Sequence, residues 1–300
     1  MATQVPHVIP YQGSKRRLAP RILSLVKSKP GTLFEPFAGS AAVTLFAATK
    51  GTASRYEIGE ILQPLADLWV LVITHPSKLS GRYRELWEPG VSSPEHYLEV
   101  RDSFNRTHDP AMFLYLMARC VKGAIRFNSA GHFNQSADKR RVGMHPDKME
   151  RNIRLASALL TGKTSVRFAD YEELLREAGP NDLVYMDPPW QGTSTSRDTR
   201  YAQPLDLARL TTNLEFLNSR CVPYLLSFDG RCGDKTYGQE LPEHLGLRRL
   251  DLPAGRSSQA TLIGAEAHTV ESLYVSPGLG ARLQHGEVLE EEPSQLGLNL

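Results

Sequence analysis

Short apolar runs alternate with helical patterns along the first quarter of the chain. The runs TLFEPF at 32–37 and SRYEI at 54–58 have the length of buried strands, and segments 40–50 and 63–74 repeat apolar residues at helical spacing. A strand, a helix and a second strand in this order are typical of a parallel sheet. The pattern therefore predicts a parallel sheet whose faces are covered by helices.

Residues 76–161 interrupt this alternation, because their pattern is mainly helical. The helices that we expect in this segment cover 94–105, 110–122 and 146–161. Between the last two lies 123–141, which is rich in Gly, Asn and Ser and predicts a hairpin or an ordered loop.

Strand patterns return after the helical segment. The strands predicted there cover 164–170, 182–187, 222–229, 247–252 and 270–276. We therefore expect an α/β fold in which a mostly parallel sheet, with helices on both faces, is interrupted by a smaller and mainly helical domain. The predicted parts are a sheet domain at 1–75 and 162–280, a helical insertion at 76–161, and a disordered tail at 281–300.

The overall composition narrows the function only by exclusion. A chain of 300 residues can bury a full core, and its net charge of +2 does not indicate any class of binding partner. Cys120, Cys221 and Cys232 lie far apart, which argues against a disulfide framework or a zinc site and favours a reducing cytoplasm. We see neither a signal-peptide pattern nor an apolar run that spans a bilayer, so we expect no membrane association.

Positive charge is concentrated in one part of the helical segment. Residues 119–154 hold nine Lys and Arg against three Asp and Glu, a net charge of +6. The aromatic Phe127 and Phe133 and the amides Asn128 and Asn134 lie among these cations. Such a mixture favours phosphate neutralisation together with base contacts, and therefore nucleic acid. A solvated helix face beside a charged loop is the alternative.

A turn of small residues follows the first predicted strand. In FEPFAGS at 34–40, this turn lets a ligand approach the backbone, and the next helix begins where a carboxylate or phosphate can bind. About 20 residues later, Glu57 and Glu60 compete as the acid that accepts ribose hydroxyls at the end of the second strand. A tight structural turn and an exposed helix-start glutamate are the alternatives. The loop YQGSK at 11–15 adds a lysine that can face a carboxylate.

The sequence LVYMDPPW at 183–190 ends a predicted strand on an acid, two prolines and an aromatic residue. Asp187 lies at the carboxyl end of the strand, where open α/β sheets bind ligands. Prolines donate no backbone proton, so the acid and a nearby carbonyl form a pair of acceptors for an exocyclic amine. Trp190 offers a flat face on which a base can stack. The alternative is a rigid turn with a capping aspartate and a core tryptophan.

On these residues the chain resembles the Dam-type, alpha-class DNA adenine-N6 methyltransferases. The resemblance covers roughly 8–276, and the motifs that carry it are PYQGSK at 10–15, FEPFAGS at 34–40, IGEILQPLADLW at 58–69, RFNSAGHFN at 126–134, RFADY at 167–171 and DPPW at 187–190. Their order along the chain is also the order in that family. The resemblance implies a Rossmann-like methyltransferase sheet, a helical target-recognition insertion, and methyl transfer from S-adenosylmethionine to a flipped-out adenine.

The resemblance also implies roles for individual residues. The catalytic tetrapeptide is Asp187, Pro188, Pro189 and Trp190. The residues implied in binding S-adenosylmethionine, and its product S-adenosylhomocysteine, are Tyr11, Lys15, Phe37, Ala38, Gly39, Ser40, Glu60, Phe168, Asp170 and Asp187. The residues expected to contact DNA are Arg126, Asn128, Asn134, Lys139, Arg140 and Arg141. No metal is required.

Four positions depart from the family pattern. Ala41 replaces a second glycine after the methionine-binding motif, which we treat as a small change, and Leu62 replaces a common asparagine. A proline usual in the recognition loop is absent near Ser136, and Trp190 replaces the usual tyrosine. Tryptophan keeps the stacking face of the tetrapeptide but has no hydroxyl.

Several other functions are compatible with parts of the pattern. Methylation of the cytosine 4-amino group needs the same acceptor pair, although its motif usually begins with serine. RNA adenine methylation and a non-catalytic DNA-binding relative are further alternatives, whereas an oxidoreductase would need a GxGxxG turn that FAGSAA does not supply. The expected partner is double-stranded DNA, with a cognate restriction endonuclease left open. The resemblance favours a cytoplasmic monomer encoded by a bacterium or a phage.

Overall fold

The architecture comes from a computed structural model, which describes residues 4–91, 93–189, 205–232, 235–237, 240–256 and 268–283. The strands are β1 Thr32–Glu35, β2 Arg55–Glu60, β3 Thr164–Phe168, β4 Leu183–Met186, β5 Tyr224–Cys232, β6 Lys235–Tyr237, β7 Arg248–Arg256 and β8 His268–Val275. The helices are α1 Ala19–Ser24, α2 Ala42–Lys50, α3 Gln63–Thr74, α4 Pro76–Gly90, α5 Pro94–Thr107, α6 Pro110–Arg119, α7 Pro146–Leu160, α8 Tyr171–Glu177, α9 Leu207–Ser219 and α11 Pro277–Leu283. Short 3₁₀ turns are η1 Lys15–Arg17, η2 Val121–Gly123 and η3 Glu243–Leu245.

All seven predicted strands are present, with ends that differ by a few residues from the prediction. The additional strand β6 has only three residues, too few for a period-2 pattern to be recognised. The helix predicted at 110–122 ends earlier, at Arg119, and a 3₁₀ turn follows it. Within the described residues, no helix is both long enough and apolar enough to cross a bilayer.

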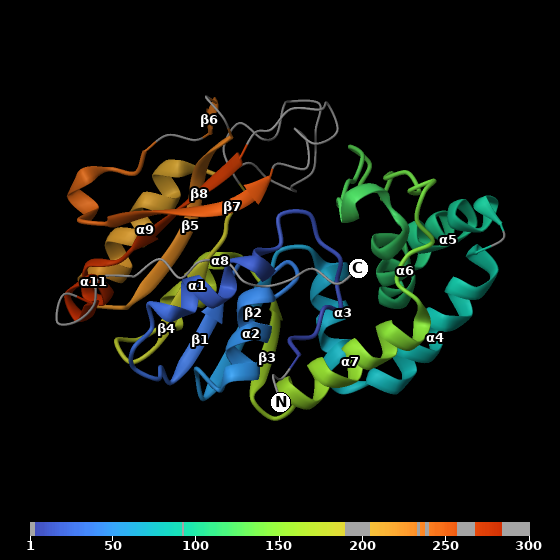
Figure 1. Ribbon diagram of the computed structural model, residues 1–300, viewed down its shortest axis with the longest axis horizontal. Helices are drawn as coiled ribbons and strands as arrows, with labels where there is room; N and C mark the ends of the chain where they lie inside the picture. Colours follow the sequence, from blue (N-terminus) through green and yellow to red (C-terminus); the bar gives the residue numbers. More distant parts are fainter. Residues whose placement is uncertain are drawn as a thin grey trace.

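The strands form one sheet in the order β3-β2-β1-β4-β5-β8-β7, with β6 paired to β5 (Figure 1). The pairs from β3 to β5 are parallel, whereas β8 and β7 continue the sheet with antiparallel pairing. This confirms the predicted mostly parallel sheet. The chain passes from β1 toward β2 on one side and from β4 toward β5 on the other. The strand order therefore reverses between β1 and β4, the place where open α/β sheets bind ligands at the carboxyl ends of their strands.

Helices cover both faces of the sheet, as predicted. Successive strand residues point to opposite faces, so Leu33 and Tyr185 join a core with α1 and α2, while Phe34 and Met186 join a second core with α8 and α9. In Figure 1 the blue N-terminal helices and the golden α9 accordingly lie on different sides of the strands.

The first core continues from the sheet into the helical insertion. Trp69 of α3, Phe113 of α6 and Ile153 of α7 are fully buried in the same cluster as the sheet residues. The Ser157 hydroxyl of α7 also donates a hydrogen bond to the Ile73 carbonyl of α3 at 2.9 Å. Helices α3 and α7 thus join the sheet to α4, α5 and α6, which lie to one side of it in Figure 1. The domain limits drawn from the sequence stay a prediction.

The end of the described chain is helical. Helix α11 runs to Leu283, so 281–283, which we assigned to the tail, belong to a helix. Leu279 of this helix is buried in the sheet core, which explains why the helix continues past the last strand. Residues 284–300 lie outside the described residues.

Helix α2 begins after a residue with an unusual backbone. Ala41 has φ 45° and ψ 40°, the left-handed conformation, and it is fully buried. A side chain at such a position costs about 1–2 kcal/mol, a cost that glycine avoids. The replacement of glycine by Ala41 is therefore not the small change that we expected, because alanine at this turn strains the backbone.

We predict that Ala41→Gly leaves the free energy of unfolding unchanged or raises it by up to about 1 kcal/mol, because relief of the left-handed strain offsets the lost methyl group. The matched control, Ala47→Gly, lies in the buried interior of the same helix and should lower stability by about 1–2 kcal/mol. Urea unfolding of both variants measures the difference. Equal losses in the two variants would contradict the strain at Ala41.

Candidate active site

The turn that joins β1 to α2 is held from three directions. Gly39 has φ 50°, and a side chain built on it would lie 3.2 Å from the Tyr11 ring. The Trp69 indole donates a hydrogen bond to the Gly39 carbonyl at 2.9 Å, and the Ala38 amide donates to the Gly59 carbonyl at 3.0 Å. The aromatic ring, α3 and β2 therefore fix a turn that needs glycine both for its conformation and for the close approach of Tyr11.

A buried carboxylate takes the place of a helix cap at this turn. Ala41, at the N-cap of α2, has no polar side chain, and Glu35 at the end of β1 accepts a hydrogen bond from the Thr44 amide at 2.8 Å instead. Free amides at a helix start stabilise an acceptor of this kind. Burial nevertheless raises the pKa of Glu35 to about 7, with the Thr44 hydrogen bonds acting in the opposite direction.

The acid at the end of β2 is bonded to the same turn. Glu60 is buried, and its carboxylate accepts hydrogen bonds from the Gly39 amide at 3.1 Å and the Leu62 amide at 3.0 Å. Burial raises the pKa of Glu60, and these amides oppose the shift. The competing Glu57 lies instead 3.8 Å from the Arg167 guanidinium. Of the two acids, only Glu60 lies at the turn after β1, and each of its oxygens can accept a further hydrogen bond.

Two apolar side chains are exposed beside Glu60. Phe168, at the end of β3, is its partner in the strand ladder and has 56% of its surface exposed. Ile61 follows Glu60 directly and is 45% exposed. Large apolar side chains at the carboxyl ends of neighbouring strands are suited to contact a flat heterocycle.

Asp170 has a structural role that the sequence did not reveal. It is the N-cap of α8, where it accepts a hydrogen bond from the Glu172 amide at 3.0 Å, and it also binds the Arg209 guanidinium at 3.0 Å. Arg209 lies over the Tyr171 ring, which in turn stacks on Phe37 at 4.9 Å between centroids. The carboxylate of Asp170 is therefore engaged by the protein itself on both of its oxygens.

A buried lysine lies beside the acid that follows β4. The Lys15 ammonium is 2.8 Å from Asp187 Oδ2 and 3.4 Å from Glu271 Oε2, and it donates a hydrogen bond to the Gly13 carbonyl at 3.2 Å. Only 8% of the Lys15 side chain is exposed. The lysine that we expected at the methionine end of a cofactor thus contacts the predicted catalytic acid directly.

Electrostatics at this cluster favour a cationic ligand. Burial raises the pKa of Asp187 to about 6, with Lys15 opposing the shift and Glu271 adding to it. Burial acts against the Lys15 ammonium as well, but Asp187 and Glu271 outweigh it and raise the pKa of Lys15. Two carboxylates, Asp187 and Glu271, share one ammonium, and the excess negative charge attracts a positive group.

One oxygen of Asp187, Oδ2, faces Lys15, and within the described residues the other, Oδ1, accepts no hydrogen bond. Pro188 and Pro189 follow, and neither has a backbone N–H. The segment after Asp187 therefore offers acceptors, among them the Pro188 carbonyl, and no backbone donor at these two positions. Trp190, the last member of the predicted tetrapeptide, lies outside the described residues.

The segment predicted as a hairpin or an ordered loop contains a short hairpin. Phe127 and Phe133 form an antiparallel bridge, and the Asn128 side chain closes the tip by accepting hydrogen bonds from the Ala130 and His132 amides. The buried Phe133 anchors the hairpin, and both its backbone groups bind the Asn105 side chain of α5. Of the predicted DNA contacts here, Asn128 and Asn134 are exposed and Arg126 is partly buried.

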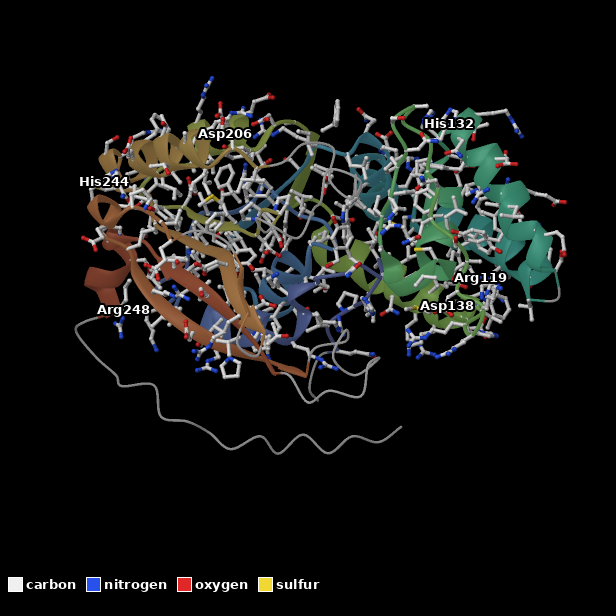
Figure 2. All side chains as sticks on the ribbon, turned by 90° about the horizontal axis from the view of Figure 1, so that it is seen from above. Arg119, His132, Asp138, Asp206, His244 and Arg248 are labelled. Carbon is white, nitrogen blue, oxygen red and sulfur yellow. The ribbon has the colours of Figure 1, made fainter. Side chains whose placement is uncertain are left out.

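The basic loop after the hairpin is held by a buried arginine. The Arg119 guanidinium donates hydrogen bonds to the carbonyls of Arg141 and Gly90, and the Asp138 carboxylate accepts one from the Arg140 amide at 2.8 Å. Figure 2 shows Arg119 and Asp138 close together in the helical part, far from Asp206 and His244 at the opposite end. The side chains of Lys139, Arg140 and Arg141 are exposed.

The structure therefore collects most predicted cofactor residues at one edge and the predicted DNA residues on the insertion. The two groups are joined by the N-terminal segment, whose Gln12 amide donates to the Gly123 carbonyl at 3.2 Å. Gly123 has φ 60°, and a side chain on it would lie 2.8 Å from the Pro10 carbonyl oxygen. The two backbones approach this closely only because position 123 is glycine.

Sequence reasoning missed four residues of this arrangement: Glu35, Trp69, Arg119 and Glu271. A signal existed for two of them, because Glu35 and Glu271 are acids at strand positions whose neighbours of the same phase are buried. Glu271 shares its strand face with the fully buried Leu273. No comparable signal identified Trp69 or Arg119, since their partners are backbone carbonyls distant in the sequence.

The strand order and the acids at the carboxyl edge are consistent with one class of protein, the Rossmann-like methyltransferases. The family model described as D12 class N6 adenine-specific DNA methyltransferase matches residues 11–251. The chain belongs to this family, and it is a DNA adenine methyltransferase.

Three relatives are 26% to 27% identical to the chain over the residues aligned. The Retron Ec67 DNA adenine methylase of Escherichia coli is 26% identical over 264 residues, covering 85% of this chain and 89% of the relative. The DNA adenine methylase of Escherichia coli K12 is 27% identical over 205 residues, covering 65% and 70%. The type II methyltransferase M1.LlaDCHI of Lactococcus lactis is 26% identical over 234 residues, covering 72% and 78%.

We predict that Glu35→Gln changes how stability depends on pH. The pKa of Glu35 is about 7 in the folded protein, compared with 4.5 for a free glutamate. Between these pH values the folded state binds a proton that the unfolded state has lost, so the wild type loses stability as pH rises. Relative to wild type, the variant should gain up to about 3 kcal/mol between pH 4.5 and 8. Chemical denaturation across this range measures the difference, and a constant difference would contradict the raised pKa.

Proposed function

We propose that the protein transfers a methyl group from S-adenosylmethionine to the exocyclic N6 amine of a flipped-out adenine in duplex DNA, at a specific site. The observation that carries this proposal is the position of Asp187: a partly buried acid, 20% exposed, at the carboxyl end of β4, where the strand order reverses. An amine with two hydrogens needs two acceptors, and Asp187 together with the carbonyl of Pro188 supplies them.

The residues at the carboxyl edge fit S-adenosylmethionine. Glu60 would accept the ribose hydroxyls, and the exposed Phe168 and Ile61 would cover the adenine ring. Gly39 and Ser40 would hold the methionine end, where the shared negative charge favours a cation. The bound cofactor supplies an electrophilic methyl group on a positively charged sulfur. Both oxygens of Asp170 already accept hydrogen bonds from Arg209, so Asp170 would contact the adenine amine only through their remaining lone pairs.

The chemical problem lies in the target amine. Its lone pair is delocalised into the ring, so it is a weak nucleophile, and it lies inside the duplex until the base is flipped. Asp187 and the Pro188 carbonyl would accept its two hydrogens, which concentrates electron density on the nitrogen. Asp187 would also stabilise the positive charge that develops on the amine, while fixed positioning supplies much of the acceleration. Trp190 would stack on the base.

The insertion supplies the surface for DNA. The exposed Lys139, Arg140 and Arg141 would neutralise phosphates, and the hairpin residues Asn128 and Asn134 would reach base edges. Because the Asn128 carbonyl oxygen already closes the hairpin tip, this residue would contact DNA through its amide nitrogen.

The relatives support a proposal for the biological setting. They are bacterial or phage-encoded, and one is a type II methyltransferase, so we propose a monomeric enzyme that modifies bacterial or phage DNA, with a cognate restriction endonuclease as a potential partner. Cytosine methylation is not favoured, because the matching family is adenine-specific. The alternative of a non-catalytic relative is opposed by the buried pair of Lys15 and Asp187, which costs free energy to maintain without chemistry.

We predict that Asp187→Ala loses nearly all methyl transfer, at least about a thousandfold, while binding of S-adenosylmethionine is largely kept. The reason is that the variant removes one of the two acceptors for the target amine. Single-base sequencing of methylated adenines, in DNA treated with the purified enzyme, measures methyl transfer. Titration with S-adenosylmethionine measures cofactor binding. Glu215→Ala on the exposed face of α9 is the control, and unchanged turnover in Asp187→Ala would refute the assigned role.

We predict that the double change Arg140→Ala and Arg141→Ala weakens DNA binding about tenfold and lowers the salt slope of the binding constant by about 1–2. Two fewer phosphate contacts release fewer counterions. Arg176→Ala with Arg220→Ala, two arginines on the α8 and α9 side, is the matched control. Equal affinity and equal slope in both double variants would remove the basic loop from the interface.

A further inference from the structure

The Lys15 ammonium lies among three acceptors that come from three parts of the chain. Asp187 follows β4, Glu271 belongs to β8, and the Gly13 carbonyl precedes the lysine itself. The ammonium donates a hydrogen bond to the Gly13 carbonyl and lies 2.8 Å from Asp187, whereas Oε2 of Glu271, 3.4 Å away, makes an ion pair with it and no hydrogen bond. This arrangement fixes the lysine head in place even though its stem is flexible.

Glu271 reaches this cluster although β8 is not a neighbour of β4. Strand β5 lies between them, and Glu271 pairs with Gly230 of β5, which has no side chain to separate it from the cluster. Glu271 is on the same face of β8 as Leu273 and Val275, both fully buried. An acid in this phase is costly unless a buried cation compensates it, and Lys15 is that cation.

A lysine with a single acid partner would impair the proposed chemistry. If Lys15 faced Asp187 alone, it would hold the carboxylate in a tight pair and weaken it as an acceptor for an amine. A second acid divides the ammonium between two carboxylates. The net charge of the three groups is then −1, which leaves negative charge on Asp187.

We propose that Glu271 is a positioning residue for methyl transfer: it shares the Lys15 ammonium, so that Asp187 keeps the available oxygen and the negative charge that the target amine needs. This inference rests on the proposed role of Asp187 and extends it to a strand on which the sequence analysis placed no site residue. Glu271 itself does not touch the substrate.

The other groups that face this cluster are consistent with the proposal. Burial raises the pKa of Glu35 of β1 to about 7, and Asp187 adds a smaller contribution to the same shift. Tyr185 of β4 is fully buried, its hydroxyl lies 3.0 Å from the Ser227 hydroxyl of β5, and burial with the surrounding acids raises its pKa, so it stays neutral. Lys15 is thus the cation on which both acids converge.

The test is Glu271→Gln in the full-length protein, with kcat measured against pH under saturating S-adenosylmethionine and duplex DNA. Without Glu271 the lysine pairs with Asp187 alone, so kcat should fall about tenfold and its acid limb should move to lower pH by about one pH unit. Cofactor affinity should stay within about twofold. Asp251→Asn is the matched control, because it removes an exposed acid on the adjacent strand β7 and should leave both readings unchanged.

The outcomes separate this inference from the proposed function. If Asp187→Ala is inactive but Glu271→Gln has the wild-type pH profile and kcat, the positioning role is overturned and the function stands. A large loss of cofactor affinity in Glu271→Gln would also overturn it, because the residue would then be a cofactor ligand. Glu271→Asp keeps the charge, so it should keep the acid limb near its wild-type position even if Glu271→Gln folds poorly. A shifted limb in Glu271→Asp would contradict a role through charge.

Discussion

A buried ammonium between two carboxylates is the interaction on which the candidate active site depends. Taking Lys15, Asp187 and Glu271 out of water is expensive, and their mutual attraction repays this cost only when every group has a partner. The cluster therefore ties the N-terminal segment to the ends of β4 and β8. Movement of one element would leave a charge in the cluster without compensation, so Asp187 is held in one position.

The N-terminal segment also links the helical insertion to the carboxyl edge of the sheet. Within the five residues 11–15 it contacts Gly123 before the hairpin through Gln12, the turn after β1 through Tyr11 and Ser14, and Asp187 through Lys15. One short stretch of backbone therefore contacts both the insertion and the carboxyl edge of the sheet. The hydrophobic core that includes α3 and α7 also joins the two parts, because it continues from the sheet into the insertion.

Sequence reasoning was most successful where a local pattern carries the information. Asp187 was identified because a strand, an acid and two prolines follow one another, and the β4 strand indeed ends at Met186. It was least successful for Ala41 and Asp170. The strain at Ala41 is a property of the turn geometry, and the ion pair of Asp170 joins it to Arg209, which lies 39 residues away in the chain.

Local sequence patterns were enough to predict the strands, the helical insertion and the family. These follow from periodicity and from residue types whose backbone preferences act over a few positions. Three other contacts arise only in the folded chain: Glu271 shares the lysine of Asp187, Glu35 accepts the Thr44 amide at the start of α2, and Arg119 holds the basic loop. These contacts join residues up to 256 positions apart, and they exist because the strand order and the two-sided packing of the sheet bring them together, which no local pattern encodes.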